Sequence, residues 1–267
     1  MVYSTKPKSH SAGRRPSCQP VLATGESLGG PVNNGGPALA GLADSAHDFE
    51  ISETESILFA LAQAVEQRDH QTAGHCERLA FISVAMGMAM GLGRAKLLAL
   101  YRGGFLHDVG KVGIPDSILF KPGALTAEEW VTMRSHTTRG EDICRHLTSL
   151  SPVMPIIRHH HEKWDGTGYP DGLRGEQIPQ LPRIVQVADI YDALISARPY
   201  KAAFTAHDAL RIMQEETDRG WRDPEIVTLF FSLHKGVISK IAEYTTGADR
   251  NLEAMRNTLA NLQSALG

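Results

Sequence analysis

Apolar residues recur at intervals of three and four along the chain from about residue 52, and no segment alternates apolar with polar residues. Intervals of three and four place side chains on one face of a helix, whereas a half-buried strand requires alternation. The sequence therefore predicts an all-α fold. The expected helices begin at residue 52 and cover 75–90, 94–108, a segment from 126 through 136, 184–195, 206–216 and the chain from 224 onward.

Local signals refine the middle of this pattern. Thr126 and Glu129 have the spacing of a capping box, which predicts a helix start at this point. Gly110 is expected to end the helix before it, because glycine accepts the backbone conformation of a helix terminus. The prolines and glycine of residues 114–123 then predict an extended connection.

Three stretches of the chain differ in composition. Residues 1–50 are rich in serine, glycine, proline and asparagine without a periodic apolar face, which predicts a disordered leader. A capping box of Ser52 and Glu55 opens a domain expected to cover residues 51–246. Residues 247–267 predict a C-terminal helix with an apolar stripe, which would either form a coiled coil in a homodimer or pack on its own domain. The stripe consists of Leu252, Met255, Leu259, Leu262 and Leu266.

Charge and composition exclude several classes of protein. The 267-residue chain has a formal net charge of −3, whereas a protein that binds long nucleic acid needs a basic face. Its three cysteines are too few for a disulfide framework, which favours a reducing cytoplasm. The longest weakly polar stretch, residues 79–93, is shorter than the roughly 20 apolar residues that cross a bilayer. No membrane partner is therefore expected, and a small anionic ligand remains compatible.

Glycines and prolines crowd residues 164–182 and exclude a helix there. A connection of this length inside a helical domain is usually functional. We therefore expect a long structured loop that contributes to a binding site.

Histidines and aspartates recur where a metal ion could be held. His107 and Asp108 follow an apolar helix, although a lone His-Asp pair is equally typical of a surface or capping pair. Asp189 lies in an apolar helical frame, where a carboxylate is costly unless it meets a metal or a cation, so a ligand role is favoured. The further candidates are His75, His136 and the run His159, His160 and His161.

This ligand set has no thiolate and therefore suits iron, manganese or a similar divalent ion. Six or more ligands indicate more than one metal ion, and a pair of ions about 3.5–4 Å apart is the standard clamp for in-line displacement at a phosphodiester. Lys111, beside Asp108, could then stabilise or protonate the leaving oxygen.

Two segments resemble the defining signatures of the HD-GYP family, which groups metal-dependent phosphodiesterases of the bacterial messenger cyclic di-GMP. The first is His-Asp-Val-Gly-Lys at 107–111, shared with the wider HD phosphohydrolase superfamily, and the second is the longer run at 160–170. The resemblance covers roughly residues 52–235 and implies a helical HD domain. It implies metal ligation by His75, His107, Asp108, His136, His160, His161 and Asp189, with Asp108 and Lys111 catalytic. His159, the extra member of its run, is expected near the ligands or exposed.

The same resemblance implies contacts to substrate. Lys111 would contact phosphate, and Arg198 and Lys201 would contact the nucleotide, with a solvated helix end as the alternative for the last two. Asp69 would accept from a guanine edge. The Gly-Tyr-Pro motif, which consists of Gly168, Tyr169 and Pro170, would shape the pocket rim and could bind diguanylate cyclase (GGDEF) domains.

One position bears on the number of metals. Some family members hold a third metal with a carboxylate four residues before the first histidine, where this chain has Gln71. An amide is a poor ligand for that role. We therefore expect two divalent ions, and the same departure leaves open whether hydrolysis stops at pGpG or proceeds to GMP.

These features predict a cytoplasmic enzyme that hydrolyses cyclic di-GMP in bacterial signalling. Two other metal enzymes fit parts of the pattern, namely an HD phosphohydrolase acting on mononucleotides and a di-iron oxygenase. The first leaves the paired histidines and the glycine-rich loop unexplained, and the cations favour phosphate over oxygen chemistry. A non-catalytic cyclic di-GMP receptor or interaction module is the remaining alternative, and such a protein would be expected to lose ligands.

Overall fold

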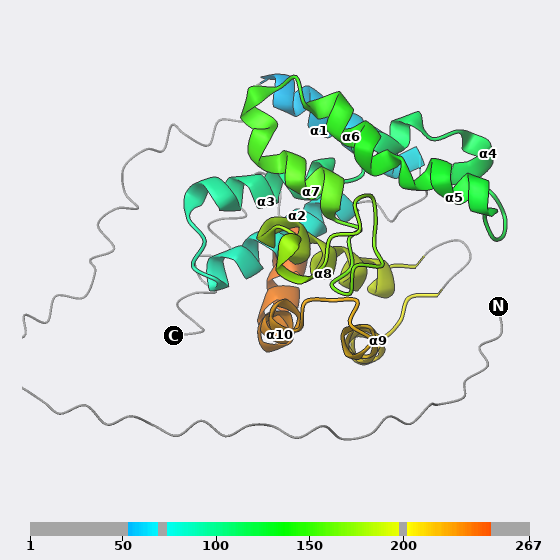
Figure 1. Ribbon diagram of the computed structural model, residues 1–267. Coiled ribbons are helices and arrows are strands. Elements are labelled where there is room, and N and C mark those ends of the chain that lie inside the picture. The colour runs from blue at the N-terminus through cyan, green and yellow to red at the C-terminus, as the bar shows by residue number, and fades with distance from the viewer. Residues whose placement is uncertain (1–52, 69–73, 198–201, 247–267) are drawn as a thin grey trace, which may run out of the picture. The chain divides into compact units, whose positions relative to one another are not determined.

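The computed structural model describes residues 53–68, 74–197 and 202–246, and it is helical throughout this part (Figure 1). No strand occurs among these residues, where the sole β-type pairing is an isolated bridge between Asp165 and Arg174. The predicted all-α class is therefore confirmed. The α-helices are α1 (Glu53–Arg68), α2 (His75–Ala89), α3 (Arg94–Leu106), α4 (Asp116–Leu119), α5 (Ala127–Arg134), α6 (His136–Cys144), α7 (Met154–His159), α8 (Gln180–Ile195), α9 (Ala206–Asp218) and α10 (Pro224–Thr246).

Helix α2 lies at the centre of the core and packs against α3, α8 and α10. Eleven of its residues are buried, so it is apolar on nearly all sides, and full burial of a side chain such as Phe81 contributes about 1.5–3 kcal/mol. Gly104 lets α3 approach α2 closely, because a Cβ there would lie 2.6 Å from the Ala80 backbone. This packing holds the start of α2, at His75, beside the end of α3.

The predicted capping box at the start of α5 is confirmed. The Glu129 amide donates to Thr126 Oγ1 at 3.2 Å, and the Thr126 amide donates to Glu129 Oε2 at 2.7 Å. The expected single helix through residue 136 is wrong, because α5 ends at Arg134 and α6 begins at His136. The Ser135 hydroxyl donates to the Thr132 carbonyl at 2.6 Å, a side-chain bond that competes with the helical ladder.

The prediction of an extended connection over residues 114–123 is also partly wrong. A 3₁₀ helix, η3 (Val109–Gly113), follows α3, and the short helix α4 begins directly after Pro115, whose fixed backbone angle suits a helix start. Gly110 serves close packing in η3, since a Cβ there would lie 1.9 Å from the His136 carbonyl oxygen of α6. This contact brings Asp108 and His136 together.

A long loop joins α7 to α8, as predicted, and contains the short 3₁₀ helix η5 (Gly175–Gln177). Helix α8 starts at residue 180, four positions before the expected 184, because Pro179 and Pro182 are compatible with a helix's first turn. Glu162, with a fully buried side chain, anchors the loop by accepting from the amides of Asp171 at 2.7 Å and Leu173 at 3.1 Å.

Several sequence predictions lie outside the described residues. They are the leader over residues 1–50, the capping box of Ser52 and Glu55, and the C-terminal helix of residues 247–267. Among the helices that the structure describes, none combines the length and apolar character needed to cross a membrane.

Candidate metal centre

The end of α3 places two polar side chains at the centre of the site. His107 caps α3, and its Nδ1 donates to the Gly104 carbonyl at 3.1 Å. Asp108 is the next residue and caps the start of η3, and its carboxylate faces His136 of α6. The adjacent imidazole and carboxylate therefore face one region, with 3.3 Å between His107 Nε2 and Asp108 Oδ2.

Three further histidines are oriented in the same manner. Nδ1 of His136 donates to the Met133 carbonyl at 2.8 Å, and Nδ1 of His160 lies 3.0 Å from the Ile157 carbonyl. Nδ1 of His75 donates to Asp192 Oδ2 at 2.7 Å. A proton on Nδ1 leaves Nε2 with its lone pair, the state in which imidazole binds a metal.

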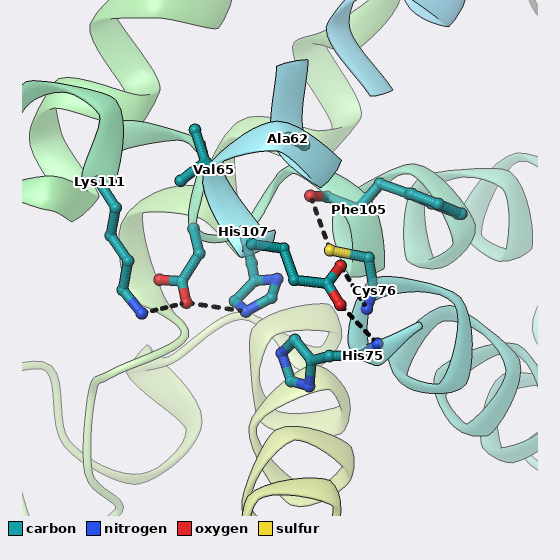
Figure 2. Close-up of a pocket in the computed structure, with 9 residues that line it drawn as sticks. Ala62, Val65, His75, Cys76, Phe105, His107 and Lys111 are labelled. Carbon is teal, nitrogen blue, oxygen red and sulfur yellow. Dashed lines mark hydrogen bonds and ion pairs between the residues drawn. The ribbon is translucent and has the colours of Figure 1, made fainter. Parts of the chain in front are cut away.

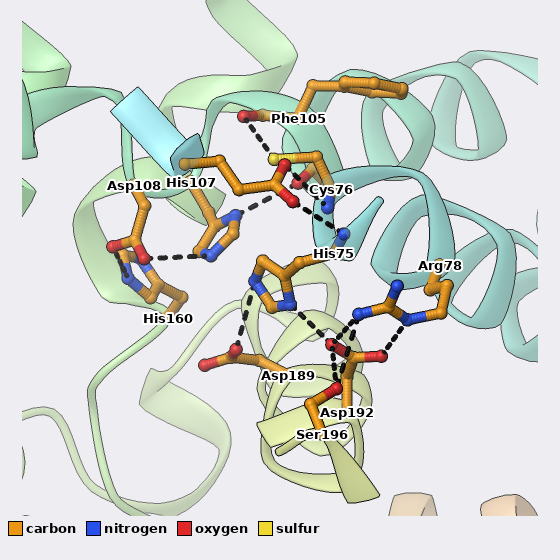
Figure 3. A network of polar contacts seen from close by, with 12 residues as sticks. His75, Cys76, Arg78, Phe105, His107, Asp108, His160, Asp189, Asp192 and Ser196 are labelled. Carbon is orange, nitrogen blue, oxygen red and sulfur yellow. Dashed lines mark hydrogen bonds and ion pairs between the residues drawn. The ribbon is translucent and has the colours of Figure 1, made fainter. Parts of the chain in front are cut away.

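The lone pairs meet in two adjoining clusters, each with its candidate ligand atoms within 4.8 Å of one another. Asp108 joins them, because Oδ1 lies 3.2 Å from His136 Nε2 in one cluster while Oδ2 faces His107 in the other. Figure 3 shows His107, Asp108 and His160 on one side of this region and His75 with Asp189 on the other. The first cluster comprises Asp108, His136, His160 and His161, and the second comprises His75, His107 and Asp189.

Buried ligand atoms without hydrogen-bond partners also indicate that these side chains can hold divalent cations. Nε2 of His75, Nε2 of His107 and Oδ1 of Asp108 are buried and have no hydrogen-bond partner in the described part of the chain. Each such atom costs about 1–3 kcal/mol if it stays unsatisfied. Three of them at the junction of two clusters indicate a place where positive charge is received.

Lys111 stabilises the ionised form of Asp108, the carboxylate that joins the two clusters. Its Nζ lies 2.8 Å from Asp108 Oδ2, and Figure 2 shows Lys111 and His107 reaching the same pocket. Burial opposes ionisation of Asp108, but the Lys111 ammonium and the His107 imidazole outweigh it and hold the Asp108 pKa well below its usual range. Burial, together with His160 and His136, keeps the His161 pKa well below its usual value. At neutral pH both groups therefore present lone pairs.

The sequence predicted that Asp189 is both a metal ligand and a buried carboxylate. In the structure Asp189 lies in a candidate ligand cluster, whereas Asp192 is the buried carboxylate. The Asp189 side chain is 23% exposed and lies 3.7 Å from His75 Nε2, at the open side of the second cluster. Asp192 is the buried carboxylate of α8, at 1% exposure, and Arg78 neutralises it. The argument that a buried carboxylate needs a cation therefore applies to Asp192.

Sequence reasoning missed the residues that support the ligands. Asp192 lies three positions after Asp189, and Arg78 lies three positions after His75. Residues at this spacing share a helix face, so each supporting residue lies on the same face as a candidate ligand, and this was the available signal. Glu66 gave no local signal. It is buried, and its carboxylate accepts from the amides of His75 at 2.7 Å and Cys76 at 3.3 Å, which fixes the start of α2.

The Gly-Tyr-Pro segment lies against the first cluster. The Tyr169 ring stacks on His161 with 4.8 Å between ring centres, and its amide donates to the His161 carbonyl at 3.2 Å. A Cβ at Gly168 would lie 2.2 Å from the backbone nitrogen of Lys163, so this turn requires glycine. Pro170 follows Tyr169 through a cis peptide bond.

His159 belongs to neither of the two clusters, and its side chain is 14% exposed. Its Nδ1 is 3.5 Å from Asp171 Oδ2 and 3.9 Å from Glu162 Oε1. Both carboxylates already accept other hydrogen bonds, those of Asp171 from Arg158. Asp69, Gln71, Arg198 and Lys201 lie outside the described residues.

Comparisons with known proteins identify the family of this chain. A model of the HD domain family matches residues 60–226. The chain is 38% identical over 215 residues to a cyclic di-GMP phosphodiesterase of Vibrio cholerae, covering 74% of this chain and 44% of that protein. It is also 38% identical over 191 residues to 3'3'-cGAMP-specific phosphodiesterase 3 of Vibrio cholerae, covering 72% and 41%. The chain thus spans less than half the length of either relative.

A solved structure supports the fold alone. The crystal structure of a cyclic GMP-AMP-specific phosphodiesterase of Vibrio cholerae superposes with a TM-score of 0.56 at 22% identity, over 77% of this chain and 53% of that one.

The family match and the curated relatives confirm the resemblance that the two signatures indicated. The chain therefore belongs to the HD domain family.

Proposed function

We propose that this chain is a metal-dependent phosphodiesterase that hydrolyses cyclic di-GMP. The observation that carries the proposal is the convergence of seven imidazole and carboxylate side chains on two clusters joined by Asp108. The names of the relatives support a cyclic dinucleotide as substrate and include both cyclic di-GMP and 3'3'-cGAMP.

Seven side chains would hold two divalent ions, and their nitrogen and oxygen donors favour iron or manganese. When bound, the ions would supply Lewis-acid activation of water and neutralise phosphoryl oxygens. Asp108 is suited to bridge them because its two oxygens face different clusters. The expected ligands are His75, His107 and Asp189 for one ion, His136, His160 and His161 for the other, and Asp108 for both.

Lys111 would serve the leaving group. Its ammonium lies beside Asp108 and lines the same pocket as His75 and His107, where a phosphate oxygen could replace the carboxylate as its partner. As water adds to phosphorus and the bond from phosphorus to the ribose 3' oxygen breaks, Lys111 would donate a proton to that oxygen. Asp69, Arg198 and Lys201 would contact the nucleotide, and Gln71 would leave the site with two metals.

The test combines chromatography with metal analysis. Protein purified without oxygen and reconstituted with iron or manganese should convert cyclic di-GMP to pGpG or GMP, and Asp108→Asn should abolish the conversion. About two ions per chain should be found. Intact nucleotide with tight binding would favour a receptor instead, and three ions would contradict the argument from Gln71. Parallel assays with 3'3'-cGAMP would define the substrate.

A further inference from the structure

Arg134, in the last turn of α5, extends the site beyond the candidate ligands. Its guanidinium carbon lies 5.2 Å from the centre of the Tyr169 ring and 5.8 Å from the centre of the Trp130 ring. Tyr169 in turn stacks on His161 of the first cluster. One aromatic ring therefore connects this guanidinium to the candidate metal centre.

The donors of Arg134 are available to a ligand. Its side chain is exposed and has no carboxylate partner within the ranges that the structure describes. Glu129, on the same helix, is committed, because its Oε2 accepts from the Thr126 amide at 2.7 Å and from Lys121 at 2.6 Å. Trp130 is 45% exposed, although it is large and apolar. An uncompensated guanidinium beside an exposed indole is suited to a planar, electron-rich ligand.

Guanine has the matching chemistry. Its O6 and N7 are adjacent acceptors that the guanidinium fork can satisfy together, whereas adenine presents an amino donor in place of O6. Indole rings also provide a stacking surface for bases. We propose that Arg134 and Trp130 form a subsite for one guanine of the cyclic dinucleotide, an inference that rests on the proposed phosphodiesterase function.

The neighbouring residues favour a ligand contact over a merely structural pair. Trp130 and Arg134 are four apart on α5, so a cation–π contact between them alone would serve only the surface of this helix. The guanidinium also reaches Tyr169, on a loop 35 positions farther along the chain. It thus lies where the rim of the candidate metal centre meets α5.

The experiment compares two substrates of the reconstituted protein, cyclic di-GMP and bis(p-nitrophenyl) phosphate, a diester without guanine. Arg134→Ala should raise the KM for cyclic di-GMP about tenfold or more and leave kcat within about twofold, since a stacked and hydrogen-bonded base is lost. Kinetics on the small diester should stay unchanged. Arg134→Lys should restore little, because an ammonium lacks the planar fork. Arg145→Ala, which removes an exposed arginine paired with Asp142, is the control.

An unchanged KM for cyclic di-GMP in Arg134→Ala, or an equal loss on both diesters, would overturn the subsite. A wild-type chain that cleaves neither diester would refute the proposed function instead. Calorimetric binding of cyclic di-GMP to the metal-free chain then decides the subsite by itself. A Kd raised about tenfold in Arg134→Ala but not in Arg145→Ala would support it, and equal Kd values or no binding by the wild type would overturn it.

Discussion

Nδ1 of His75 donates a 2.7 Å hydrogen bond to Oδ2 of Asp192, a carboxylate on α8 whose side chain is 1% exposed. Arg78 holds the same carboxylate with two bonds, from Nε at 2.6 Å and from a terminal nitrogen at 2.9 Å (Figure 3). Asp192 therefore fixes both the orientation and the tautomer of a candidate metal ligand without belonging to either ligand cluster. Partners of this kind orient a ligating imidazole and are typically needed for full metal affinity.

Asp192→Asn is expected to weaken metal binding about 10- to 100-fold, as the loss of such a partner typically does. The variant should also lose about 3 kcal/mol of unfolding free energy, because Arg78 would lose its counter-charge. Chelator competition measures the first quantity and urea denaturation the second. Asp223→Asn is the control, since it breaks the buried pair with Arg183, a 2.6 Å contact away from the clusters. Equal metal affinity in the wild type and Asp192→Asn would contradict this role.

Glu162→Gln is expected to loosen the loop between α7 and α8. An amide group keeps only one acceptor for the Asp171 and Leu173 amides, and hydrogen bonds to charged groups contribute about 1.5–3 kcal/mol each. Limited proteolysis should show faster cleavage within residues 165–178, and urea denaturation should show a loss of about 2 kcal/mol. Glu128→Gln, at an exposed position of α5, should change neither. Unaltered proteolysis of Glu162→Gln would mean that the loop is held by other contacts.

Local signals predicted the parts of the fold that depend on local chemistry. The capping box at Thr126 and the helical spacing of residues 75–90 concern neighbours in sequence, and both match the structure closely. The break at Ser135 and the helical turns after Asp108 were missed. The break at Ser135 comes with a local bond from its hydroxyl to the Thr132 carbonyl, whereas the turns after Asp108 pack against α6 through Gly110 and His136, which are 26 positions apart.

In the candidate site, too, the sequence predicted the ligand residues but not the long-range contacts that support them. The family resemblance implied seven side chains, and the structure brings all seven into two adjoining clusters. Their supporting residues could not be found in this way, because Glu66 acts on His75 from another helix and Asp192 acts from a third. The apolar frame of α8 led us to expect a buried carboxylate at Asp189, but the carboxylate that is buried, and paired with Arg78, is Asp192.

Asp171 provides a test of pH dependence away from the metal clusters. Two hydrogen bonds from Arg158 hold the Asp171 pKa below its ordinary value, so the folded state favours the ionised form. Its contribution is present above the unfolded-state pKa of about 3.9 and is lost as pH falls through the lower folded-state pKa. Because the carboxylate is about one-third exposed, we expect at most about 1 kcal/mol. Urea denaturation between pH 5 and about pH 2 should give a shallower acid decline for Asp171→Asn than for the wild type, and parallel curves would contradict this assignment.

Gly110→Ala is expected to separate η3 from α6 and to disturb the metal centre with the fold. The added Cβ would lie 1.9 Å from the His136 carbonyl oxygen and 2.5 Å from the Gly140 nitrogen, both backbone atoms that cannot rotate away. Overpacking of this kind costs about 3 kcal/mol or more, and the resulting shift would move Asp108 relative to His136. Gly93→Ala is the control, because a Cβ there meets nothing within 4 Å and the backbone is extended. The unfolding free energy measured by urea denaturation and the metal content should both fall for Gly110→Ala, and neither should fall for Gly93→Ala. A Gly110→Ala variant that binds metal as the wild type does would show that the close contact between η3 and α6 does not position Asp108.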